Sequence, residues 1–194
     1  MSIMSHKDKF FFVHIEKNAG SSITKFLKKN LQDSLHFKDR EYNGPLKGMG
    51  GITANEYINT FGKDMWEEYF SFCIVRNSWD RIVSWYKYDQ EHLDYRKLSF
   101  DSWLELFEEN YGLNQLRFFN SESGKNMVDF IGRYENLEED FSFICNKLNI
   151  ENAKLPHINR TKDRNHYSSF YTKKTKDFVF ECCREEIEMF NYKF

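Results

Sequence analysis

Two strongly apolar runs, each followed by a polar loop and an amphipathic helix, constrain the fold of this chain more than any other feature. The runs are residues 10–13 (FFFV) and 69–76 (YFSFCIVR). The second is apolar almost throughout, which is typical of a strand buried on both faces of a parallel sheet. A third strand is predicted over residues 127–135 (MVDFIGRYE). Strands that alternate with helices in this way predict an α/β fold.

Helical spacing of apolar residues predicts the elements between and after these strands. In the segment 52–61, Thr53 is a candidate N-cap with Glu56 three residues on, the spacing of a capping box. The expected architecture is a three-layer sandwich, with a central parallel sheet flanked by helices, in a single domain of residues 1–194. The predicted helices cover 21–31, 52–61, 78–89, 99–111, 137–150 and, as one or two helices, 172–190.

Composition excludes several classes of protein. A chain of 194 residues is long enough for a real core, and a net charge of −2 predicts no bulk attraction to nucleic acid. No apolar run approaches the roughly 18–20 residues of a membrane span, and the N-terminus lacks the apolar region of a signal peptide. The four cysteines form no C-x-x-C pair. We therefore expect reduced cysteines in a cytoplasmic protein.

The first loop, HIEKNAGSS (residues 14–22), has the features of an anion site. Gly20 allows a close backbone approach, and Ser21 and Ser22 are expected to open the helix with N–H groups and hydroxyls facing outward. Lys17 adds a mobile charge where the strand ends. The lysine precedes the glycine, unlike in the nucleoside triphosphate motif G-x-x-x-x-G-K-[ST]. The alternative is an ordinary strand-to-helix turn with a solvated lysine.

The second loop begins at Arg76, which leads directly from the buried strand into a helix. Arg81, Ser84 and Tyr88 follow at helical spacing and are expected on one face. Arg76 with Ser84 provides a planar fork and a hydroxyl for a second phosphate. The alternative is that Asp80 and Arg81 are surface charges, and that Arg76 caps the edge of the sheet.

The two loops resemble motifs of the family-2 (carbohydrate-type) sulfotransferases. HIEKNAGSSI resembles the 5′-phosphosulfate loop H-I-P-K-T-A-G-T-S, and FCIVRNSWDRIVSWY resembles the 3′-phosphate motif F-x-x-V-R-N-P-x-D-R-x-x-S-x-Y. Later segments are similar as well, so the resemblance runs from about residue 10 to the C-terminus. It implies a P-loop-like fold and transfer of the sulfuryl group of 3′-phosphoadenosine 5′-phosphosulfate (PAPS) to an acceptor hydroxyl. The family leans towards glycans, so we expect a carbohydrate or another small hydroxylated molecule as the acceptor. We also expect no metal, because one lysine near the bridging oxygen could replace it, and no nucleic-acid partner.

The resemblance also assigns residues. Arg76 and Ser84 would bind the 3′-phosphate, Arg133 and the tail around Asn159 and Arg160 would line the same nucleotide, and Lys17 would neutralise charge on the leaving phosphate. The phosphosulfate would be held by Lys17, Asn18, Ala19, Gly20, Ser21 and Ser22.

Three positions depart from the family pattern. Glu16 and Ser78 stand where the family has proline, and the second change predicts a less rigid loop. Gly51 stands where related bacterial members carry the histidine of H-x-T-A, the expected general base. The candidate replacements are His36, which we rank first, and Glu41, Glu16 and His157. His14 is expected to be structural.

The sequence says less about the acceptor and about which of the alternative functions applies. Residues 38–51 and the aromatic-rich segment 85–119 are expected to shape the acceptor pocket, although most of these aromatic residues also suit core packing. One alternative is a catalytically silent protein that binds PAPS or its desulfated product, 3′-phosphoadenosine 5′-phosphate (PAP). The other is a P-loop-type kinase, which predicts a lysine after the glycine and an acidic Mg²⁺ ligand.

Overall fold

The computed structural model describes residues 2–31, 33–37, 51–92, 98–151, 155 and 166–194. The chain divides into two compact units, which we describe separately. The sheet unit comprises Met1–Val75 and Leu116–Arg160, and the helical unit comprises Arg76–Gln115 and Thr161–Phe194. The expectation of a single domain stays a prediction.

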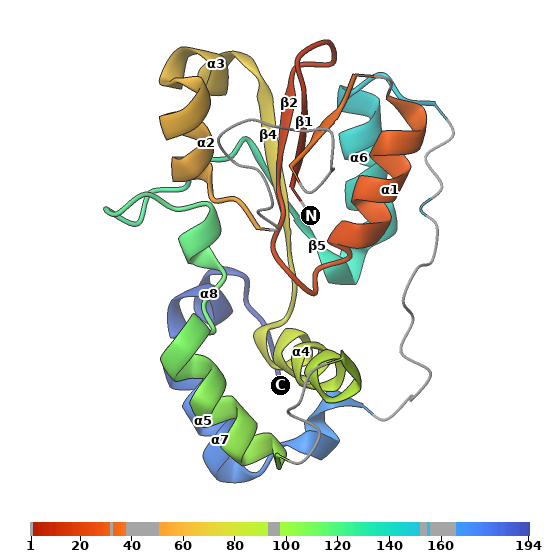
Figure 1. Cartoon of the computed structure of the whole chain (residues 1–194). Coiled ribbons are helices and arrows are strands. Elements are labelled where there is room, and N and C mark those ends of the chain that lie inside the picture. Colours follow the sequence, from red (N-terminus) through yellow and green to blue (C-terminus); the bar gives the residue numbers. More distant parts are fainter. Residues whose placement is uncertain (1, 32, 38–50, 93–97, 152–154, 156–165) are drawn as a thin grey trace. The chain divides into compact units, whose positions relative to one another are not determined.

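The sheet unit contains a five-stranded sheet in the order β3-β1-β2-β4-β5 (Figure 1). β2, β4 and β5 are parallel, whereas β1 is antiparallel to both β2 and β3. The sheet is therefore mixed at one side, where the sequence predicted only parallel strands. The reason is the short connection of β1 to β2, which allows a hairpin but no crossover. The strands are β1 (Ile3–Ser5), β2 (Phe10–Val13), β3 (Leu35–His36), β4 (Phe70–Val75) and β5 (Phe130–Arg133).

Helices cover both faces of this sheet, which confirms the α/β sandwich. Figure 1 shows α2 and α3 on one face and α1 and α6 on the other. Alternation along β2 explains the two cores: Phe10 and Phe12 belong to the buried cluster with α1 and α6, whereas Phe11 packs on the rings of Tyr57 and Trp66. The helices are α1 (Gly20–Asn30), α2 (Ala54–Phe61), α3 (Lys63–Glu68) and α6 (Leu137–Lys147), with short 3-10 helices η2 (Leu116–Phe118) and η3 (Tyr134–Asn136).

The start of α2 confirms the predicted capping box. The Thr53 hydroxyl accepts a hydrogen bond from the Glu56 N–H, and the Glu56 carboxylate accepts from the Thr53 N–H at 2.7 Å. α3 was not expected from the sequence, because its six residues are too few to show a helical period.

The helical unit has an aromatic core. Trp85 and Trp103 each pack on Phe107 with ring centroids 4.7 Å apart, and Tyr86 packs on Phe100 at 5.2 Å. These rings therefore pack on one another within the unit, and the expectation that residues 85–119 shape an acceptor pocket stays a prediction. Its described elements are α4 (Ser78–His92), α5 (Phe100–Tyr111), η4 (Tyr167–Phe170), α7 (Lys173–Cys182) and α8 (Arg184–Met189).

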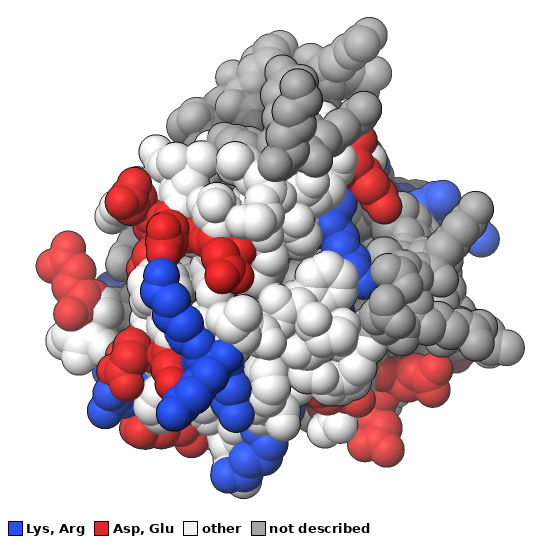
Figure 2. All heavy atoms as spheres, turned by 90° about the horizontal axis from the view of Figure 1, so that it is seen from below, with Lys and Arg blue, Asp and Glu red and all other residues white. Residues whose placement is uncertain are grey.

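Three further observations concern the expectations drawn from composition: the state of the cysteines, the apolar character of the helices and the surface charge. All four cysteines are free thiols, and burial raises the pKa of Cys145 from 9.0 to about 11. Among the described residues, no helix combines the length and the apolar character needed to cross a bilayer. On the face drawn in Figure 2, basic and acidic side chains lie interspersed.

Candidate functional site

Three parallel strands of the sheet unit, β2, β4 and β5, end at one edge, and several of the predicted site residues follow or close these strands. β2 ends at Val13 just before the first loop, and β5 ends at Arg133. The register pairs Val75, the last residue of β4, with Arg133. Arg76 is the next residue of the chain after Val75. Parallel α/β sheets bind their ligands outside this carboxyl edge.

The backbone of the first loop is shaped to present N–H groups. Lys17 and Ala19 have φ angles of 69° and 61°, in the left-handed region that residues other than glycine rarely adopt. Ala19 is the N-cap of α1 and makes no side-chain capping bond, while its carbonyl accepts from the N–H groups of Ser22 and Ile23. The first N–H groups of a helix have no partner within it. An uncapped helix start behind left-handed residues is therefore suited to an anion.

Gly20 is required by its contact with His14. A Cβ atom on Gly20 would lie 1.8 Å from Cδ2 of the His14 ring, closer than any side chain allows. His14 is buried, in agreement with its expected structural role, and its ring lies 6.0 Å from that of Phe12. The glycine thus allows the loop to close onto a ring of the same chain.

The remaining loop residues differ in their surroundings. The Asn18 side chain is buried, and its Nδ2 donates to the Ile74 carbonyl at 2.8 Å, which ties the loop to β4. Ser21 is exposed, as expected. Ser22 is buried, so the expectation that both hydroxyls face outward is wrong for this residue. The reason is that Ser22 lies one helical turn before Phe26, on the buried face of α1.

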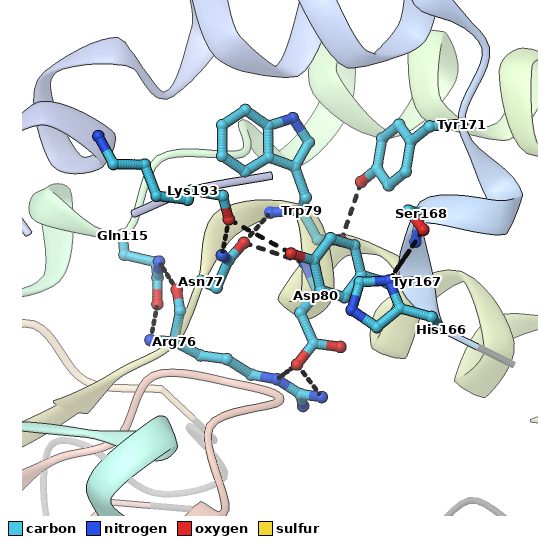
Figure 3. A network of polar contacts seen from close by, with 10 residues as sticks. All are labelled: Arg76, Asn77, Trp79, Asp80, Gln115, His166, Tyr167, Ser168, Tyr171 and Lys193. Atoms are coloured by element: carbon cyan, nitrogen blue, oxygen red, sulfur yellow. Dashed lines mark hydrogen bonds and ion pairs between the residues drawn. The ribbon is translucent and has the colours of Figure 1, made fainter. Parts of the chain in front are cut away.

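In the helical unit, the Arg76 guanidinium forms an ion pair with Asp80. Its Nε and Nη2 both lie 2.8 Å from Oδ2 of Asp80, and the Arg76 side chain is 12% exposed (Figure 3). Asp80 and the half-buried Ser84 are one helical turn apart on α4. The sequence interpretation missed this ion pair, although an acidic residue four positions after the arginine is a recognisable signal.

Arg81, Ser84 and Tyr88 lie on one side of α4, as their spacing predicts, but they differ in burial. Arg81 is 1% exposed, its Nη1 donates to the Leu113 carbonyl at 2.9 Å, and its guanidinium lies 5.0 Å from the centre of the Trp85 ring. Tyr88 is exposed. The expected common face of the helix therefore agrees with the structure, but the alternative of Arg81 as a surface charge is wrong, because the unit buries this residue.

Arg133 is half-buried at the end of β5, where its N–H donates to the Asp140 carboxylate at 2.5 Å. This bond links the end of the strand to α6 and orients the residue at the carboxyl edge. The other residues that the sequence assigned to the nucleotide, Asn159 and Arg160, lie outside the described residues.

A cavity of about 360 Å³ opens in the sheet unit beside the first loop. It is lined by Glu16, Gly51, Thr53, Glu56, Arg117 and Phe118. A Cβ on Gly51 would lie 3.2 Å from the Phe118 ring and 3.3 Å from the His14 carbonyl oxygen. Gly51, the position at which the motif resemblance led us to expect a histidine, is therefore next to the loop. Arg117 carried no motif that would have marked it in the sequence.

Two of the four candidate bases lie among the described residues. Glu16 lines the cavity, whereas His36 is 5% exposed in β3 and pairs across the ladder with Ile3. Ile3 in turn pairs with Phe12, so β1 separates His36 from β2. The other two candidates, Glu41 and His157, lie outside the described residues, as does most of the expected acceptor loop.

These features define a class of protein. A mostly parallel sheet, helices on both faces, and an uncapped helix behind a left-handed loop at the carboxyl edge of β2 form the P-loop-like α/β fold.

A sequence profile of the sulfotransferase family matches residues 1–193, and the chain belongs to this family. A protein of Archaeoglobus fulgidus described as uncharacterized is 34% identical over 112 residues, which cover 56% of this chain and 91% of that protein. Mouse sulfotransferase SULT7A1, crystallised in complex with PAP, has the same fold, with a TM-score of 0.53 and 15% identity over 94% of this chain and 86% of its own. A sulfotransferase from Alicyclobacillus acidocaldarius gives a TM-score of 0.48 at 14% identity over 96% of both chains.

Proposed function

We propose that the chain transfers the sulfuryl group of PAPS to a hydroxyl of a carbohydrate or another small hydroxylated acceptor. The observation that carries this proposal is the start of α1, which is uncapped and follows two left-handed residues, Lys17 and Ala19. Membership of the sulfotransferase family supports sulfuryl transfer in general. The mouse relative crystallised with PAP supports the choice of donor by analogy.

The residues fit a donor that carries two separate anionic groups. The N–H groups of Gly20 and Ser21 and the Lys17 ammonium would bind the phosphosulfate, while Asn18 holds the loop to β4. Arg76 and Ser84 would bind the 3′-phosphate through a charged fork and a hydroxyl. Arg133, Ala19 and Ser22 complete the proposed nucleotide site.

The proposed reaction is an in-line displacement. The bond from sulfur to the bridging oxygen of the donor phosphate breaks as the acceptor oxygen bonds to sulfur, and the hydroxyl proton passes to a base. Transfer of this kind resembles phosphoryl transfer, in which positioning and charge stabilisation account for most of the catalysis. Lys17 would neutralise the charge that develops on the leaving phosphate.

The first test of this function is binding of PAP followed by transfer of labelled sulfate. At a PAP concentration 100 times Kd, a single site stabilises a protein by about 2.7 kcal/mol, which corresponds to a rise in Tm of about 5–10 °C for a chain of this size. We expect this rise, and labelled sulfate in at least one member of a panel of glycans and phenols. A PAP-dependent rise without transfer would favour the silent binding protein. No rise would contradict the proposal.

The base is assigned by comparing two variants. General bases contribute about 100- to 10,000-fold to rates, so we expect Glu16→Gln to lower kcat by about 100-fold, because Glu16 lines the cavity beside the loop. His36→Asn should change kcat by less than about 3-fold, because a side chain this buried has little access to an acceptor. Both are measured at saturating PAPS, with the Kd of PAP determined in parallel.

Glu56→Gln is the matched control. It removes a second carboxylate from the same cavity, yet glutamine preserves the capping box of α2. Its kcat should therefore stay close to that of the wild type. If His36→Asn lowers kcat and Glu16→Gln does not, the base is His36, the candidate that we ranked first from the sequence.

A further inference from the structure

A fully buried carboxylate, Glu186 of α8, lies outside the residues to which the proposed function gives a role. Its Oε1 accepts hydrogen bonds from Oγ of Ser78 at 2.5 Å and from Nε2 of Gln115 at 3.0 Å, and its Oε2 accepts from the Gln115 N–H at 2.5 Å. Burial of a charged group is costly unless hydrogen-bond donors satisfy it. Here three donors from two distant segments of the chain converge on one carboxylate. All of them lie within the helical unit.

Gln115 connects this carboxylate to the main chain of Arg76. Its Nε2 donates to the Arg76 carbonyl at 2.9 Å, and its Oε1 accepts from the Arg76 N–H at 3.1 Å (Figure 3). Because Nε2 also donates to Glu186, both of its protons have acceptors. The reverse orientation would place Oε1 against two acceptor oxygens. Glu186 and the Arg76 peptide groups therefore favour the same orientation of the Gln115 amide, and this amide holds the peptide groups on both sides of Arg76.

Ser78 attaches the same segment to Glu186 from the other side. It is the first residue of α4 and lies two residues after Arg76, where the sulfotransferase motif has proline. Proline at this helical position fixes φ without a hydrogen bond. A hydroxyl that donates to a buried carboxylate restrains the same residue by a different physical means. This hydrogen bond counters the loss of rigidity that the sequence predicted for serine.

The guanidinium itself is held by a separate contact, its ion pair with Asp80. A planar arginine fork binds two phosphate oxygens only when its plane and its Cα position are both fixed. The Glu186 network, which we define as Glu186, Gln115 and Ser78, restrains the main chain, and Asp80 orients the fork.

We propose that the Glu186 network is a positioning device for Arg76, and that it determines how well the chain distinguishes a 3′-phosphorylated nucleotide from one without that phosphate. The inference rests on the proposed function, since it takes Arg76 as the ligand of the 3′-phosphate. Glu186, Gln115 and Ser78 touch no substrate in this proposal and act through Arg76.

The test uses calorimetric titration of the full chain with PAP and with adenosine 5′-phosphate (AMP). The ratio of the AMP Kd to the PAP Kd measures the contribution of the 3′-phosphate alone. Because single hydrogen bonds change equilibria by about 2- to 10-fold, we expect Ser78→Ala to lower this ratio about 5-fold. Gln115→Leu, which removes several bonds, should lower it by about 10-fold or more. Ser78→Pro should keep the ratio within about 2-fold of the wild type, because proline restores the restraint on φ.

A variant of similar structural cost is the control. Thr172→Ala removes the N-cap of α7 in the same unit, where the threonine hydroxyl accepts from the Thr175 N–H. It should lower Tm and leave the ratio unchanged. If the Glu186 network had a merely structural role, Ser78→Ala and Gln115→Leu would likewise lower Tm and leave the ratio unchanged.

The outcomes separate the inference from the function on which it rests. If the wild type binds PAP more tightly than AMP, and Ser78→Ala and Gln115→Leu lower Tm without changing the ratio, the inference is wrong and the proposed function stands. If the wild type does not bind PAP, the proposed function fails first. If Gln115→Leu does not fold, the two serine variants test the inference. A ratio that is unchanged in Ser78→Ala, or lowered in both Ser78→Ala and Ser78→Pro, would contradict it.

Discussion

Lys17→Ala should lower kcat by about 100- to 1,000-fold, the range observed when one preorganised charge-stabilising group is removed from an active site. The lysine has its proposed effect in the transition state, when charge moves onto the leaving phosphate. The Kd of PAP should rise by less than about 10-fold, because the N–H groups of the loop and the start of α1 still bind the phosphate. Single-turnover transfer of labelled sulfate and calorimetric titration with PAP measure the two effects separately.

The controls address the unusual backbone at this position. Lys17 has a φ of 69°, and alanine retains its Cβ, so the substitution changes the side chain without relieving the left-handed conformation. Lys17→Met keeps the aliphatic stem and should lower kcat by the same factor as Lys17→Ala. Lys25→Ala, which removes an exposed lysine of α1, should not. Unchanged turnover in Lys17→Ala would exclude the proposed role.

Arg76→Ala should weaken PAP binding by about 100-fold, since truncation of one partner of a charge-assisted, bidentate contact costs about 2–5 kcal/mol. The Kd of AMP should change by less than about 3-fold, because AMP lacks the 3′-phosphate that Arg76 is proposed to bind. Titration of the variant with both nucleotides measures this difference. Arg76→Lys should restore part of the affinity for PAP, because a lysine supplies charge but no fork.

Arg184→Ala provides a matched comparison. It removes an arginine of the same unit that is also paired with a carboxylate, Glu181, but is half exposed at the surface. Binding of both nucleotides should be unaffected. If Arg76→Ala weakens PAP and AMP equally, Arg76 does not recognise the 3′-phosphate, and another cation must be sought.

Much of the fold is predictable from the sequence because the signals are local. The apolar runs at β2 and β4 coincide with strands within one residue, and Thr53 with Glu56 marks the start of α2. The two short strands β1 and β3 carry no comparable pattern. They form because antiparallel pairing with a neighbouring strand satisfies their backbone groups, which is a property of the assembled sheet.

The proposed site rests on signals that are also local. The motifs point to Lys17, Gly20 and Arg76, and the structure places the first two at the carboxyl edge of the sheet. The burial of Arg81 and of Ser22 depends on which side of a helix packs against its unit. The network of Glu186 with Gln115 depends on contacts between residues 71 positions apart. No spacing rule within a single motif predicts such a contact.

The sequence by itself determined the alternation of the longer strands and helices, the family, and the loops in which an anion would be sought. These follow from periodicity and from short motifs, which act over a few residues. Only the tertiary structure decided that Gly20 accommodates the ring of His14, that Glu16 lines a cavity, and that Ser78 donates to a buried carboxylate. The physical reason is that close packing and hydrogen bonding in a folded interior join residues distant in the chain, and their partners are set by the whole fold.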